Sequence, residues 1–148
     1  MSEQFNKGKQ LIVAIILGIL TYWLFAQSFL NIAPHVQRFY HVDMSIVNIA
    51  VSLTSLLTGV FIVVAGGLSD KIGRVKITNA GLILSILGSI ALIISHAPIL
   101  LLLGRVLQGL SAACLLPATI ALINSFFQGE ERQKVLSYWS FGSYGGTG

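Results

Sequence analysis

The chain has 148 residues, of which 55% are hydrophobic and only 9% are charged, and its formal net charge is +4. A soluble domain carries about 25% charged residues, so this composition excludes a water-soluble globular protein. The basic residues form short clusters at the ends of apolar runs, whereas nucleic-acid binding needs a continuous basic face. The composition therefore indicates an all-α membrane protein with no soluble domain and no nucleic-acid partner.

Four apolar runs are long enough to cross a bilayer, whose hydrocarbon core of about 30 Å needs about 20 apolar residues per helix. They cover residues 10–33, 44–66, 77–95 and 99–127. The first is too long for the apolar part of a signal peptide, so we interpret it as a retained helix. A fifth run, residues 135–148, spans only about 21 Å at about 1.5 Å per residue. We therefore predict one membrane domain over residues 1–148, with four complete transmembrane helices and the start of a fifth.

The distribution of Lys and Arg predicts the orientation of these helices. Seven basic residues lie on one side of the predicted membrane: Lys7, Lys9, Lys71, Arg74, Lys76, Arg132 and Lys134. Only Arg38 lies in a connection on the other side. Because cytoplasmic loops carry the excess of basic residues, we expect the N-terminus in the cytoplasm and residues 34–43 outside.

The connection between the second and third runs combines glycines, an acid and bases, at Gly66, Asp70, Lys71, Gly73, Arg74 and Lys76. We expect the glycines to allow a sharp exit from the second helix. Asp70 is placed to cap a helix N-terminus, or to pair with Arg74 if that stretch is helical. Such contacts contribute about 0.3 to 2 kcal/mol, a size that suits a conformational latch. The alternative is a solvated loop whose bases only set the topology.

The fourth run contains a cation, Arg105, followed by Gln108 and Gly109. A cation at bilayer depth costs about 2.5 to 3.5 kcal/mol on insertion scales. We expect Arg105 to face a polar cavity or a partner; the alternative is snorkelling to the outer interface. Small residues also recur in this run and in the third, at Gly81, Ser85, Gly88, Ser89, Gly104, Gly109, Ala112 and Ala113. This spacing favours close helix packing in the fourth run and leaves the question open in the third.

No nucleophile–base pair, phosphate loop or metal-ligand cluster is recognisable, so the sequence does not suggest an enzyme or a metal site. The single cysteine, Cys114, cannot form an intrachain disulfide and is interpreted as a packing residue.

Two motifs resemble those of the major facilitator superfamily. The pattern Gly-x-x-x-Asp-Lys-x-Gly-Arg-x-Lys, from Gly66 to Lys76, is similar to the signature loop between helices two and three on the cytoplasmic side of that family. The run from Leu103 to Gly109 resembles its helix-four motif, which implies a role for Arg105 in proton coupling. From about residue 8 to residue 148 the chain resembles bacterial quinolone-resistance efflux pumps, among the fourteen-helix drug:proton antiporters.

The resemblance implies part of an N-terminal six-helix bundle, in a proton-coupled multidrug transporter of the bacterial cytoplasmic membrane. It implies the lipid bilayer, amphipathic drugs and protons as partners, and a missing C-terminal bundle. It implies no cofactor, with a proton gradient as the energy source. Trp23, Phe25 and Gln27 are candidates for lining a cavity that stacks flat cationic drugs. For the aromatic residues the alternative is packing or contact with lipid.

One departure from the family concerns the acid that many such antiporters carry in helix one. Here no Asp or Glu lies inside any of the four complete runs, so the proton-carrying carboxylate is expected elsewhere. Two rival hypotheses remain. A small homo-oligomeric multidrug transporter would need a membrane-embedded acid, and a truncated, non-transporting fragment would only associate with other helices.

Overall fold

The computed structural model describes residues 2–145, in which six helices are joined by short connections, with no strand among the described residues. In chain order the helices are α1 (Ser2–Asn31), α2 (Ala33–Tyr40), α3 (Met44–Ile72), α4 (Arg74–Ile93), α5 (Pro98–Phe126) and α6 (Gly129–Gly145). Four stretches are long and apolar enough to cross a membrane: Gln10–Asn31, Met44–Ile72, Arg74–Ile93 and Pro98–Phe126. The predicted all-α architecture with four complete spans is confirmed.

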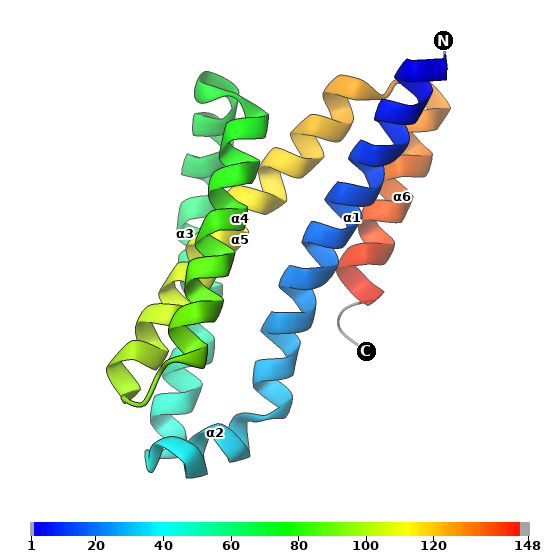
Figure 1. Ribbon diagram of the computed structural model, residues 1–148. Helices are drawn as coiled ribbons and strands as arrows, with labels where there is room; N and C mark the ends of the chain where they lie inside the picture. Colours follow the sequence, from blue (N-terminus) through cyan, green and yellow to red (C-terminus); the bar gives the residue numbers. More distant parts are fainter. Residues whose placement is uncertain (1, 146–148) are drawn as a thin grey trace.

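The helices form two groups joined by α5 (Figure 1). Helices α1 and α6 lie side by side, α3 and α4 form the second group, and α5 crosses from one group to the other. The start of α1, the α3–α4 junction and the α5–α6 junction lie at one end of the molecule. Helix α2 and the α4–α5 turn lie at the opposite end, as expected for helices that alternate in direction.

The prediction that the second helix ends at Gly66 is wrong, because α3 continues to Ile72. Gly66 and Gly67 both lie within the helix. Glycine is tolerated in transmembrane helices, where neighbouring structure keeps the backbone bonded. The chain breaks at Gly73 instead, whose φ of +115° lies in a region that favours glycine. The long loop predicted between residues 66 and 76 is therefore reduced to one residue.

Most of residues 34–43 form the short helix α2. Pro34 lies in its first turn, where a missing N–H is harmless. The helix ends at His41, which has a left-handed backbone with φ of +50°. Two apolar clusters hold the helices together. One joins α1, α5 and α6 around Ile19 and Ile123, and the other joins α1, α2, α3 and α5 around Val47 and Leu101.

Helix α5 is the centre of the bundle. Half of its apolar window is buried, against 13 to 17% for the other three spans. A Cβ added to Gly109 would lie 2.7 Å from the Thr54 carbonyl oxygen of α3, and one added to Gly88 would lie 3.0 Å from the Gly104 carbonyl oxygen. The backbones therefore approach closely, so the packing face predicted for the fourth run is confirmed. For the third run the sequence did not decide whether the small residues form a packing face. They do, because Gly81 and Gly88 both contact α5.

We predict that Gly109→Ala destabilises the protein by about 1 to 3 kcal/mol, because the new methyl group forces α3 and α5 apart. Its three nearest neighbours are Thr54 O, Leu57 Cβ and Thr54 Cα, and none of these atoms can rotate away, because two belong to the backbone and a Cβ is fixed to it. The measurement is the thermal unfolding midpoint in detergent. Gly59→Ala is the matched control, because nothing lies within 4 Å of the added Cβ. Equal midpoints for the two variants would contradict the close approach.

Candidate functional site

The α3–α4 junction places Asp70 and Arg74 on either side of Gly73. The Gly73 N–H donates to the Ser69 carbonyl at 3.0 Å, which closes the last turn of α3. Arg74 Nη2 lies 3.4 Å from Asp70 Oδ1. The Asp70 side chain is 66% exposed and that of Arg74 is 36% exposed. An exposed pair of this kind contributes only about 0 to 1 kcal/mol, so it can form and break easily.

Arg74 also ties this junction to α5. Its Nη1 donates to the Ala121 carbonyl at 2.9 Å. Ala121 lies near the C-terminal end of α5, where the helix dipole favours a cation. Arg74 therefore links three helices, since it begins α4, pairs with α3 and binds α5. The Asp70 carboxylate retains acceptor capacity toward solvent.

The other residues of the motif occupy different positions. Gly66 packs against α5, where an added Cβ would lie 3.5 Å from Pro117 Cβ. Lys71 and Lys76 are exposed. The structure thus brings Asp70, Gly73 and Arg74 together and leaves both lysines pointing away from the bundle.

Arg105 is the largest side chain that is almost completely buried, with 2% of its surface exposed. Its Nη1 donates to Gln108 Oε1 at 2.6 Å, and its Nε donates to the Ala50 carbonyl of α3 at 3.4 Å. Its Cζ lies 4.4 Å from the centroid of the Phe29 ring of α1. The snorkelling alternative is therefore wrong, because the side chain turns inward and touches three helices.

No carboxylate pairs with Arg105 among the side chains that the structure describes. A buried charge is normally paired, and here an amide, a carbonyl and an aromatic face stabilise the cation instead. The site therefore keeps a net positive charge inside an apolar bundle.

Gln108 and Gly109 belong to the same α5 face. Thr54 Oγ1 donates to the Arg105 carbonyl and Thr58 Oγ1 to the Gly109 carbonyl, both at 3.1 Å. These hydroxyls bind α3 to α5 just where the glycine lets the two backbones meet. Ser111 Oγ binds α5 to α4 through the Gly81 carbonyl, at 2.7 Å.

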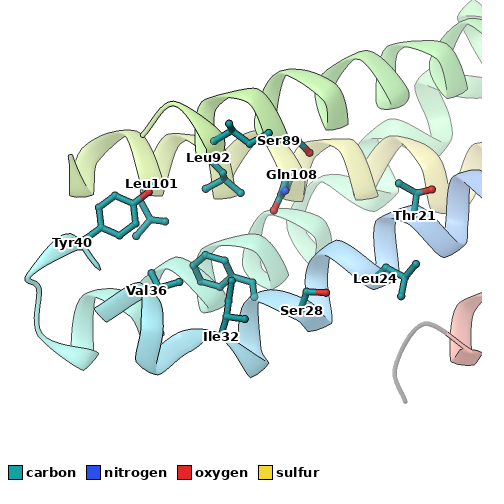
Figure 2. Close-up of a pocket in the computed structure, with 12 residues that line it drawn as sticks. Thr21, Leu24, Ser28, Ile32, Val36, Tyr40, Ser89, Leu92, Leu101 and Gln108 are labelled. Atoms are coloured by element: carbon teal, nitrogen blue, oxygen red, sulfur yellow. The ribbon is translucent and has the colours of Figure 1, made fainter. Parts of the chain in front are cut away.

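A cavity of about 650 Å³ lies between α1 and the α4–α5 pair, with α2 at one end. Figure 2 shows Gln108 pointing into it from α5. The lining residues are Thr21, Leu24, Ser28, Phe29, Ile32, Val36, Tyr40, Ser89, Leu92, Ile93, Leu101 and Gln108. Most of them are apolar, and none is acidic or basic. Because Phe29 and Gln108 also contact Arg105, the cavity and the buried cation share a wall.

Of the residues proposed from sequence to line a cavity, Trp23 does not line this one. Trp23 faces α6, where its Nε1 donates to Ser143 Oγ at 3.2 Å. The side chains of Phe25 and Gln27 lie outside the described part of the structure. Sequence reasoning missed Phe29 and the Thr54–Thr58 pair. The two threonines had a detectable signal, since hydroxyls four residues apart in an apolar run are candidates for binding a neighbouring helix.

Comparison with known proteins identifies the family of this chain. A family profile described as Major Facilitator Superfamily matches residues 11–148. The chain is 53% identical over 146 residues to the quinolone resistance protein NorB of Staphylococcus aureus, in strains JH9 and Newman alike. The match covers 99% of this chain and 32% of each relative, so the chain spans about a third of the length of the curated relatives it matches. The chain is a multi-pass membrane protein that belongs to the major facilitator superfamily, a family of transporters.

Proposed function

We propose that this chain is the N-terminal portion of a proton-coupled multidrug efflux transporter that exports amphipathic drugs such as quinolones. The observation that carries the proposal is the apolar cavity that shares a wall with buried Arg105. Such a cavity suits an amphipathic molecule. The name of the relatives, quinolone resistance protein, supports the choice of drug.

The proposed mechanism uses alternating access between two bundles. In this family three-helix inverted repeats are nested within each six-helix half. We assign α1, α3 and α4 to the first repeat, and α5 and α6 to the second. The proposal places the rest of the transport path, and the C-terminal bundle needed for activity, in the part of such a transporter that this chain does not match, since the match covers 32% of each relative. No cofactor is proposed, and the energy source is the proton gradient.

Proton coupling is proposed to involve Arg105. A buried cation favours the ionised form of a carboxylate that approaches it and disfavours the protonated form. A proton-carrying acid elsewhere in the complete transporter would therefore release its proton near Arg105 and rebind it when the bundles move apart. The lack of a paired carboxylate among the described side chains supports this role, because the cation retains its charge.

The second candidate function is a fragment that does not transport and only associates with other helices. The coverage of about a third of the relatives favours it. So does the low burial of the α1 span, which is 13% against 50% for α5. The two proposals differ in whether the chain works when the remaining two thirds are supplied.

We predict that a hybrid protein, in which this chain replaces the matching part of NorB, exports a fluorescent quinolone from cells. An uncoupler that collapses the proton gradient is expected to abolish export. Arg105→Lys in the hybrid is expected to lower the export rate at least about tenfold, since one ammonium group cannot replace the planar guanidinium and its donors. The measurement is the quinolone efflux rate at equal membrane expression. Export that survives the uncoupler would contradict proton coupling, and a hybrid that inserts but never exports would favour the second candidate.

The Asp70–Arg74 junction is proposed to be a latch between conformations. The exposed Asp70 carboxylate is available to the N-terminal end of a helix in the missing bundle. A contact between a carboxylate and a helix N-terminus contributes about 0.3 to 2 kcal/mol, which is weak enough to be released. We predict that Asp70→Asn in the hybrid lowers quinolone efflux about twofold or more without changing membrane insertion. Glu130→Gln is the matched control, because Glu130 is an exposed acid at the start of α6. Unchanged efflux in Asp70→Asn would disprove the latch.

The cytoplasmic N-terminus remains a proposal that rests on the distribution of Lys and Arg. Lys71 lies in the last turn of α3 and His41 ends α2, and both residues are exposed. Helix α2 and the α3–α4 junction lie at opposite ends of the bundle. In a Cys114→Ala background, we expect a membrane-impermeant thiol reagent added to intact cells to label His41→Cys and not Lys71→Cys. Permeabilised cells provide the control, in which both positions are labelled. Labelling of Lys71→Cys and not His41→Cys in intact cells would show that the orientation is the reverse of the one proposed.

A further inference from the structure

Gln108 stands between the buried cation and the cavity. Only 4% of its surface is exposed. Its Oε1 accepts a hydrogen bond of 2.6 Å from Arg105 Nη1, and the same side chain lines the cavity. Figure 2 shows it projecting from α5 toward the space that α1 and α4 enclose.

The direction of the Gln108 amide is fixed by chemistry. A guanidinium group only donates hydrogen bonds, so the amide oxygen must face Arg105 and the amide nitrogen must face away. No hydrogen bond among the described residues uses that nitrogen. Within that part of the chain, both of its N–H groups are available to a ligand. Donation from a cation to the amide oxygen also polarises the amide, which makes these N–H groups stronger donors.

The other polar groups of the cavity wall are largely occupied. Thr21 donates to the Leu17 carbonyl at 2.7 Å and Ser89 to the Ser85 carbonyl at 2.9 Å, both within their own helices. The Tyr40 hydroxyl donates to the Ser95 carbonyl at 3.2 Å. Of the lining groups this leaves the exposed Ser28 and the buried Gln108 amide. The cavity thus combines an apolar wall with one buried, cation-backed pair of donors.

We propose that this cavity binds the carboxylate of an amphipathic ligand through the Gln108 amide, with Arg105 behind it supplying the positive charge. The inference rests on the proposed function and narrows its substrate class to apolar molecules that carry a carboxylate. A carboxylate oxygen accepts a hydrogen bond from an N–H donor of this kind, and the net positive charge of the Arg105 site attracts it. The absence of any acid among the lining residues means that nothing in the wall repels it.

Gln108→Glu is the test, because glutamate has nearly the same shape and still accepts a hydrogen bond from Arg105. It removes both N–H donors and adds a negative charge that repels a carboxylate. The ligands are a fluorescent quinolone with a free carboxylate and its methyl ester, and equilibrium binding is measured in lipid nanodiscs. The unsubstituted chain is expected to prefer the acid. In Gln108→Glu, acid binding is expected to weaken about tenfold or more and the preference to disappear.

Ser137→Ala is the control, because it removes an exposed hydroxyl of α6 that donates to the Gln133 carbonyl of its own helix and lies outside the cavity lining; binding of both ligands is expected to stay unchanged. Equal weakening of acid and ester in Gln108→Glu would show that Gln108 acts only through the packing of Arg105. Unchanged acid binding, or no quinolone binding by the unsubstituted chain, would likewise overturn the inference.

The hybrid with NorB separates this inference from the proposed function. Gln108-dependent binding in this chain that is lost in the hybrid would mean that later helices cover the cavity, and the inference would fail. Gln108-dependent binding by a hybrid that never exports would count against the proposed function alone. Quinolone export that is indifferent to Gln108→Glu would count against the inference alone.

Discussion

The structure depends on the close approach of α5 to α3 and α4. In lipid there is no hydrophobic force to drive one apolar helix onto another, so association relies on packing and interhelical hydrogen bonds. Gly109 and Gly88 remove the side chains that would keep the backbones apart. Only then can Thr54, Thr58 and Ser111 reach carbonyl groups on the neighbouring helix. The same approach brings the Ala50 carbonyl within reach of Arg105.

The position of Arg105 follows from this packing and determines the chemistry of the interior. Its neighbours from α1, α3 and α5 stabilise the guanidinium group without neutralising it. A buried cation of this kind would attract an approaching anion strongly, because the low dielectric of the surroundings strengthens the interaction between two charges. At the α3–α4 junction, Arg74 has a different environment, since its pair with Asp70 is exposed and weak. The protein thus combines one strong internal charge with one easily broken surface contact.

The sequence predicted the helices better than their ends and their contacts. The length of the apolar runs is dictated by bilayer thickness, so four spans and the start of a further helix could be derived directly. The end expected at Gly66 was wrong, because a glycine that breaks a helix in water remains helical when neighbouring helices surround it. Arg105 was expected to face a polar cavity or a partner, but Phe29 and Ala50 could not be identified as its partners. They lie on other helices, and no local pattern in the sequence records which faces meet.

The two tryptophans of the chain have a shared environment with a practical consequence. Trp23 and Trp139 both pack against the apolar cluster of α1, α5 and α6, and their indole N–H groups bind Ser143 and Thr119. Intrinsic fluorescence at tryptophan wavelengths is therefore a local signal from that seam. A shift in emission would report loosening of α1 and α6 from the end of α5, while rearrangement confined to α3 and α4 would remain spectroscopically silent.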